Sequence, residues 1–125
     1  MSKYGDVAIT ATRLAQTGVC PMKAWNSAAT SEFKNRMASI KKGCPKNAFL
    51  GLAEGGFIQG VPSGNYTKSV LNKHYALEAL ALLNQDSNVI DDLKNLWIQA
   101  CGSASKAHNH QMNVVVSLWS HGFLK

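Results

Sequence analysis

The residue in this sequence best suited to nucleophilic chemistry is Cys44. It directly precedes Pro45, and a residue before proline favours an extended backbone, so the sequence predicts an extended Cys44 at the mouth of a helix. Free backbone amides at that helix start, together with Lys41, Lys42 and Lys46, would favour the thiolate, which is the reactive form of cysteine. Cys44 is therefore a candidate reactive thiol. The alternative is a small apolar side chain that fills the gap between two helices.

A catalytic cysteine also needs a base and an oxyanion site. His74 and His108 are the candidates for the base, but no motif links either of them to Cys44. The three cysteines include no CxxC pair, since Cys20 and Cys101 lie far from Cys44, so the sequence predicts reduced thiols and neither a disulfide nor a structural zinc site. A thiol-dependent enzyme or redox-responsive protein stays open as an alternative, while the sequence favours a protein without catalysis.

The remaining metal-binding or acid–base candidates have simpler explanations. Residues 108–110 spell HNH, but the nuclease motif of that name consists of three residues scattered over a ββα-metal unit. His110 and His121 share a helix face, yet eleven residues at a rise of about 1.5 Å separate them by about 16 Å, too far to share one ion. Asp91 and Asp92 fall in the first turn of a predicted helix, where its dipole favours carboxylates. We therefore expect no metal and no cofactor.

A glycine-rich loop at residues 55–66 runs into Thr67, Lys68 and Ser69 at the start of a predicted helix. Free N–H groups at a helix start attract anions, and Lys68 and Lys73 add positive charge. The segment lacks both the GxxxxGK[ST] and the GxGxxG patterns of nucleotide-binding loops. The loop is therefore a candidate anion site; the alternative is an ordinary turn in which Thr67 caps the helix.

The positive charge of the chain is concentrated in one third of its length. The net charge is +6, and the residues between Phe33 and Tyr75 contain seven basic residues and one acidic residue, whereas the rest contains six of each. If these side chains converge, they form a patch that attracts phosphates or other anions; the alternative is several separate solvated faces. The candidate anion-binding residues are Lys41, Lys42, Lys46, Tyr66, Thr67, Lys68 and Lys73.

Aromatic residues are interleaved with these charges, as in nucleic-acid-binding surfaces, which use cations for phosphates and rings for bases. Phe57 and Tyr66 fall in the predicted loop, where they can be exposed, while Phe33 and Phe49 lie on apolar helix faces. Residues 34–36, Lys-Asn-Arg, form only a thin version of a recognition helix. The basic segment at residues 33–75 therefore predicts an anionic partner, which can be a protein, a small molecule or a nucleic acid.

The elements that must position these residues are helices, because apolar residues recur at steps of three and four almost throughout. Pro21 suits the first turn of the second helix, and Ser105 can cap the last. The sequence predicts an all-α fold with one domain over residues 1–125, built from six or seven short helices. They are expected to pack around a central apolar helix at about residues 67–85, whose second half is apolar except for Glu78.

The composition agrees with one globular domain, since 46% of the 125 residues are hydrophobic and 16% are charged. No apolar run approaches the ~18–20 residues of a membrane span. Residues 1–20 interrupt their apolar positions with polar ones, unlike a signal peptide, so we expect a cytoplasmic location. Trp25, Trp97 and Trp119, with the apolar residues 79–83, can exceed what one small core hides, which makes a homo-oligomer a further hypothesis.

Several stretches spread over nearly the whole chain form a further pattern: YGD at 4–6, KGCPK at 42–46, FLGL at 49–52, GNYTKS at 64–69, NKHYA at 72–76, and HN, QM and LW at 108–109, 111–112 and 118–119. This pattern resembles a family of small uncharacterised bacterial proteins, a domain of unknown function, some of whose members are carried on mobile (integron) gene cassettes. The resemblance implies a bacterial cytoplasmic protein without an established activity, so it supplies no catalytic residues. Members of that family can have a second cysteine near the position of Ala53, which this chain lacks.

Overall fold

The structure is a computed structural model that describes residues 3–103 and 105–125. Over these residues the backbone forms helices without a strand, and one isolated antiparallel bridge joins Ile58 to Leu124. The predicted all-α fold of six or seven short helices is therefore confirmed. The elements are α1 (Lys3–Gln16), α2 (Pro21–Phe33), α3 (Met37–Ile40), α4 (Gly43–Glu54), α5 (Val70–Gln85), the 3-10 helix η1 (Ser87–Asp91), α6 (Leu93–Cys101) and α7 (Gln111–Ser120).

Local sequence sets several of the helix ends. Pro21 stands at the first position of α2, where its fixed φ suits the helix and its missing N–H costs nothing. The Asp92 carboxylate accepts a hydrogen bond from a backbone amide of the first turn of α6, and Gly102 ends that helix with a φ of 77°. α5 is capped by the Ser69 hydroxyl, so the prediction that Thr67 is the cap is wrong. The helix begins three residues later because the Thr67 hydroxyl instead donates to Asn47 and accepts from the Ser69 amide.

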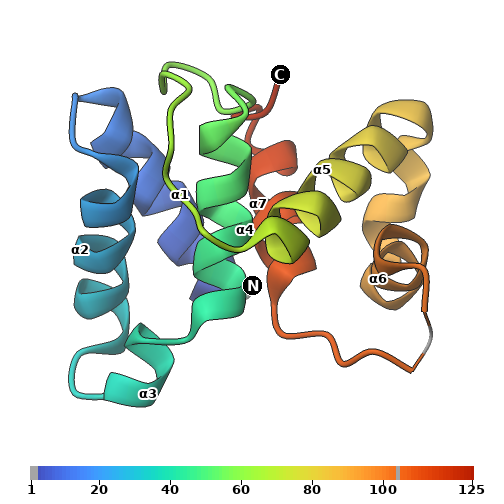
Figure 1. Cartoon of the computed structure of the whole chain (residues 1–125), viewed down its shortest axis with the longest axis horizontal. Coiled ribbons are helices and arrows are strands. Elements are labelled where there is room, and N and C mark those ends of the chain that lie inside the picture. The colour runs from blue at the N-terminus through green and yellow to red at the C-terminus, as the bar shows by residue number, and fades with distance from the viewer. Residues whose placement is uncertain (1–2, 104) are drawn as a thin grey trace.

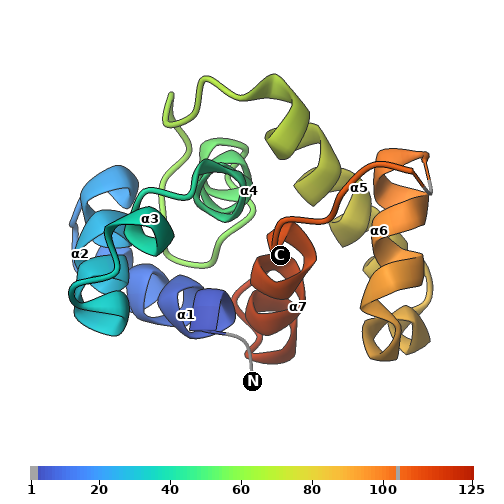
Figure 2. The ribbon, with the colours of Figure 1, turned by 90° about the horizontal axis from the view of Figure 1, so that it is seen from below.

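The helices pack in three groups, which Figures 1 and 2 show from two directions. α1 and α2 pack against each other on one side of the molecule, and α3 follows α2. α4 and α7 lie in the middle, where α4 contacts α2 and α5, and α7 contacts α1 and α5. α5, η1 and α6 form the other side.

α4 is the helix that the fold buries on every side. Residues 48–53 are all buried, and six consecutive positions point in every direction around a helix of 3.6 residues per turn. The rings of Trp25 and Phe49, whose centroids lie 5.3 Å apart, join α2 to α4. Because α4 lies in the middle of the fold, its position determines where Gly43 and Lys46, in its first turn, reach the surface.

The structure does not confirm a central apolar helix at residues 67–85. α5 lies to one side of α4 and α7 and buries one face, whereas Val70 and Leu71 are 79% and 59% exposed. α5 still approaches α4 closely, because a Cβ atom at Gly51 would stand only 2.6 Å from the Cα atom of Lys73. The apolar run therefore has neighbours on part of its circumference only, and Ala81 in its middle is exposed.

The large aromatic side chains are accommodated within the fold. Trp25 and Trp97 are buried, and Trp119 is half-buried. The large apolar side chains that are exposed belong to other residues, among them Met22 and Met37, which lie on α2 and α3. Within the described part of the chain, no helix combines the length and the apolar character that crossing a membrane requires.

Candidate anion-binding site

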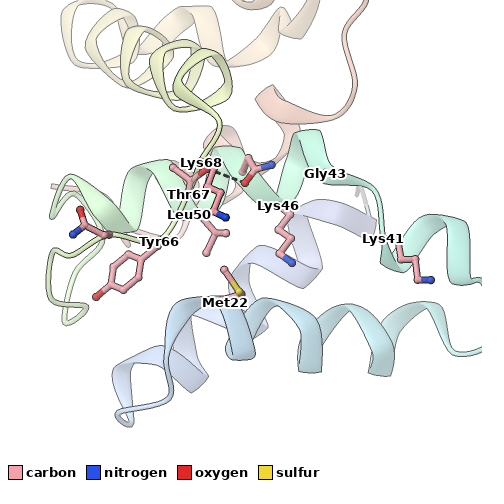
Figure 3. A pocket seen from close by; sticks show the side chains of 10 residues that line it. Met22, Lys41, Gly43, Lys46, Leu50, Tyr66, Thr67 and Lys68 are labelled. Carbon is pink, nitrogen blue, oxygen red and sulfur yellow. Dashed lines mark hydrogen bonds between the residues drawn. The ribbon is translucent and has the colours of Figure 1, made fainter.

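A cavity of about 470 Å³ lies between α2, the start of α4 and the extended segment at residues 65–68 (Figure 3). We call it the basic groove, because three lysines and no acidic residue line it. Met22 lies at its α2 side, opposite the lysines of the other two elements. The lining residues are Met22, Lys41, Gly43, Lys46, Asn47, Leu50, Asn65, Tyr66, Thr67 and Lys68.

The basic groove brings together five of the seven residues that the sequence analysis selected for anion binding, namely Lys41, Lys46, Tyr66, Thr67 and Lys68. Lys42 is the N-cap residue of α4 but does not line the groove, and Lys73 lines a neighbouring cavity with Glu54 and His74. The fold thus joins the basic segment before α4 to the basic segment before α5.

The three lysines of the groove carry unpaired charges. Neither a salt bridge nor a side-chain hydrogen bond joins Lys41, Lys46 or Lys68 to another described residue. Lys41 and Lys68 are exposed and Lys46 is half-buried. Figure 3 shows the amines of Lys46 and Lys68 on either side of the space above Met22, with Lys41 further along toward α3. Like charges gathered in a concave site make a positive potential that attracts an anion.

The glycine-rich loop is held by a carboxylate of the chain itself. Glu54 Oε1 accepts hydrogen bonds from the backbone amides of Tyr66 (2.9 Å) and Thr67 (3.2 Å), and Glu54 Oε2 pairs with Lys73 Nζ at 2.7 Å. The hydrogen bond from Lys73 and then those from the two amides lower the pKa of Glu54 to about 2. Two loop amides are therefore occupied by Glu54 and Lys73 is neutralised, so the unpaired charge lies with the lysines of the basic groove.

Two further contacts fix the polar wall of the groove. The Thr67 hydroxyl donates to Asn47 Oδ1 (2.8 Å) and accepts from the Ser69 amide (3.0 Å). Because its oxygen is used, Asn47 is left with its NH₂ group as a donor for a ligand. The Tyr66 hydroxyl donates to the carbonyl of Pro62 (2.8 Å), which holds the ring along the loop. These side chains are positioned before any ligand arrives.

Cys44 lies outside the basic groove. α4 begins at Gly43, so Cys44 is in the first helical turn, and the prediction of an extended Cys44 is wrong. Pro45 is tolerated there because the first amides of a helix need no intrahelical acceptor. The half-buried Cys44 lines a separate cavity of about 330 Å³ between the starts of α4, α5 and α7, which it shares with Tyr75 and Lys106.

Neither of the two histidines that could act as a base lines the cavity of Cys44. His74 lines the cavity beside Glu54, and His108 lies near α1 and α6. The prediction that Ser105 caps the last helix is wrong, because α7 begins at Gln111, and His108 therefore lies before the helix. His108 instead caps that helix, since its Nε2 accepts a hydrogen bond from the Met112 amide (3.0 Å). The described residues contain no group of three or more metal-binding side chains.

Sequence reasoning missed Met22, Asn47 and Asn65. Met22 is 43% exposed, although the helical period of α2 predicts a buried side chain. No local signal links α2 to residues 65–68, because their approach depends on how both pack around α4. The basic segment also splits: Lys34 and Arg36 line another cavity, at the turn between α2 and α3.

Comparison with known proteins adds a family but no function. A model described as a family of unknown function (DUF6979) matches residues 1–125. No curated protein and no solved structure matches the chain.

Proposed function

This chain belongs to DUF6979, a family of unknown function, and from its own geometry we propose that it is a small non-catalytic binding module that recognises an anionic partner through the basic groove. The observation that carries this proposal is the convergence of Lys41, Lys46 and Lys68 on one cavity without a partner of opposite charge. The sequence resemblance supports a bacterial, cytoplasmic and cassette-borne setting as part of the same proposal.

The chemistry of the groove favours phosphate or carboxylate groups. Ammonium groups donate charge-assisted hydrogen bonds to such oxygens, and the NH₂ group of Asn47 adds a neutral donor beside them. The volume of about 470 Å³ falls within the range of small-ligand sites, about 300–1,000 Å³. An anion in the groove would also relieve the repulsion among Lys41, Lys46 and Lys68, which is a gain that a neutral ligand cannot provide.

The charged side chains near the groove favour binding over catalysis. With a pKa of about 2 and both oxygens engaged, Glu54 is a poor general base near neutral pH, because an effective base has a pKa close to the working pH. Thr67 already donates its hydroxyl proton to Asn47 and accepts from Ser69. Cys44, His74 and His108 line other cavities.

A thiol-dependent function centred on Cys44 is the alternative, and one observation favours it. Lys106 also lines the Cys44 cavity, and its amine donates to the Tyr75 hydroxyl, which raises the pKa of Lys106. A lysine that keeps its positive charge beside a thiol favours the reactive thiolate. The rate of alkylation by iodoacetamide against pH tests this alternative, with Cys20 and Cys101 replaced by serine. An ordinary thiol titration at Cys44 would remove it.

A homo-oligomer is a separate hypothesis about partners. The exposed apolar side chains of Val70 and Leu71 at the start of α5 provide a surface on which two copies can meet. Sedimentation at micromolar concentration tests it, and a monomer at that concentration would count against it.

The binding proposal is tested by isothermal titration of pyrophosphate into the protein at low ionic strength. We expect the double variant K46A/K68A to lose about tenfold or more in affinity, because two charge-assisted hydrogen bonds are removed. K94A/K125A is the matched control, since it removes two exposed lysines outside the groove and changes the net charge equally. An equal loss in both variants would mean that the groove is not the site.

A further inference from the structure

We infer that the anionic partner is a single strand of nucleic acid, which runs from the basic groove past α3 into a second basic cavity. This inference rests on the proposed function and adds the class and the length of the ligand. It is carried by the arrangement of two basic cavities around one short helix.

The second cavity has a volume of about 470 Å³ and lies at the turn between α2 and α3. Its lining includes Lys3, Lys34 and Arg36, with Glu32 as the one acidic residue. Lys34 and Arg36 are exposed, and neither has a side-chain partner among the described residues. The backbone of Lys34 has a φ of 52°. Residues other than glycine rarely adopt this conformation, and those that do are concentrated at functional sites.

α3 connects the two cavities. Arg36, its N-cap residue, lines the second cavity, and Lys41, its C-cap residue, lines the basic groove. The helix has four residues and is therefore about 6 Å long, so about one helical turn separates the backbones of Arg36 and Lys41. We define the basic track as Lys68, Lys46, Lys41, Arg36 and Lys34.

The basic track is better matched by a strand than by a small anion. Figure 3 shows Lys68, Lys46 and Lys41 following one another from residues 65–68 toward α3. Arg36 and Lys34 lie at the other end of that helix, where they line the second cavity. A ligand with a single phosphate group would reach part of this row, whereas a chain of phosphates neutralises its members in succession. The length of the track therefore predicts that affinity rises with the number of nucleotides.

Apolar and aromatic side chains accompany the charges. Met22 and Met37 are 43% and 55% exposed beside the track, and Tyr66 is half-buried in the wall of the groove. Exposed apolar side chains and a partly accessible ring next to cations suit the faces of unpaired bases. A duplex read in its major groove needs a longer recognition helix, and α3 offers a single turn. These features favour a single strand.

The experiment measures fluorescence anisotropy of labelled oligothymidylates of 3, 6 and 12 nucleotides over a salt series. We expect tighter binding with each length and, for five phosphate contacts, a slope of log K against log salt of about −3.5, at about −0.7 per contact. K34A/R36A should reduce the slope for the 12-mer by about 1.4 and leave pyrophosphate binding unchanged. K46A/K68A should weaken both ligands, and K94A/K125A neither; circular dichroism checks that each variant is folded.

The possible failures are distinguishable. Pyrophosphate binding in the groove without a dependence on oligonucleotide length would overturn the strand and leave the proposed function intact. Tighter binding of a 12-base-pair duplex than of the 12-mer, or equal competition by an acidic peptide of the same charge, would also overturn it. Absence of binding by pyrophosphate and oligonucleotides alike at low salt would overturn both proposals.

Discussion

Glu54 joins the end of α4 to the glycine-rich loop and to α5 through one carboxylate. Its oxygens receive two backbone amides of the loop and the amine of Lys73, all at hydrogen-bonding distance. The carboxylate thereby does inside the protein what a bound anion would do at the same amides. It keeps Tyr66, Thr67 and Lys68 beside the start of α4, where the basic groove forms.

Replacing Glu54 with glutamine should lower the midpoint of thermal unfolding at pH 7, because the Lys73 pair and the charge at the two loop amides are lost. The pKa of Glu54 is lowered from 4.5 to about 2, so its contribution is complete above pH 4.5 and disappears as the pH falls toward 2. Thermal unfolding of both proteins across this range is the measurement. Glu78→Gln, at an exposed position on α5, is the control. A gap that stays constant with pH would contradict the role of this charge.

The lowered pKa of His108 leads us to expect a second pH dependence of the stability, in a range nearer to neutral. Burial and then the neighbouring His110 lower its pKa below 6.5, and the neutral ring accepts the Met112 amide at the start of α7. The folded state therefore favours neutral His108, so its contribution is present above pH 6.5 and is lost as the pH falls through the lowered pKa.

Urea unfolding at pH 7.5 and pH 5 measures this effect. The wild-type protein should lose more stability on acidification than His108→Gln, whose side-chain oxygen reaches the position of Nε2 and can accept the same amide without titrating. Removal of the cap in His108→Ala should cost about 0.5–2 kcal/mol at pH 7.5. An equal pH dependence in the wild-type protein and His108→Gln would show that other groups cause it.

At the scale of elements, the crossing of α4 and α5 depends on Gly51. A Cβ atom there would lie 2.6 Å from the Cα atom and 2.7 Å from the Cβ atom of Lys73, and a backbone atom cannot move aside cheaply. Gly51→Ala should therefore destabilise the protein by about 1–3 kcal/mol, measured by urea unfolding. Gly43→Ala is the control on the same helix, since its nearest neighbour, Asn47 Nδ2, would be 3.6 Å away. Equal stabilities of the two variants would contradict the close crossing.

The helices also show which features of the fold the sequence alone can predict. The helical period and local signals such as Pro21 and Gly102 predict helices and their ends, because these depend on residues one turn apart. The place of α5 depends on which helices surround it, and an apolar run carries no information about that. The Thr67 hydroxyl was available as a cap by type, but its contact with Asn47, twenty positions away, decides otherwise.

The candidate site shows the same difference between what neighbouring residues predict and what depends on contacts between distant parts of the chain. The clustering of basic residues in one segment predicted most of the groove, since Lys41, Lys46 and Lys68 surround α4 and the loop that packs on it. The opposite wall, Met22, comes from a helix outside that segment and became visible only in the fold. The pairing of Lys73 with Glu54 was likewise hidden, because charge counting does not reveal which acid meets which lysine.

At the scale of the whole molecule, charge is separated along the longest axis. The basic track follows the turn after α2, α3, the start of α4 and residues 65–68 at one side, whereas Asp86, Asp91 and Asp92 lie at the two ends of η1 at the other (Figure 1). An approaching polyanion is therefore attracted to one side and repelled by the other, which orients it before contact. The asymmetry is consistent with a binding surface rather than with a generally basic protein.

A binding site made of unpaired lysines has a cost in the free protein, because like charges repel. Replacing Lys46 and Lys68 with alanine should therefore raise the stability of the unliganded protein at low salt by up to about 1 kcal/mol, the range of exposed charge pairs. The gain should vanish near 1 M salt, where the screening length falls to about 3 Å.

Thermal unfolding of K46A/K68A and K94A/K125A at both salt concentrations measures this gain. The control K94A/K125A should show no gain, because Lys94 lies beside Asp91 and Asp92 in the sequence. A gain that persists at high salt would indicate altered packing and not relieved repulsion. A rise in stability at low salt together with a loss of binding would show that the two lysines serve the ligand and not the fold.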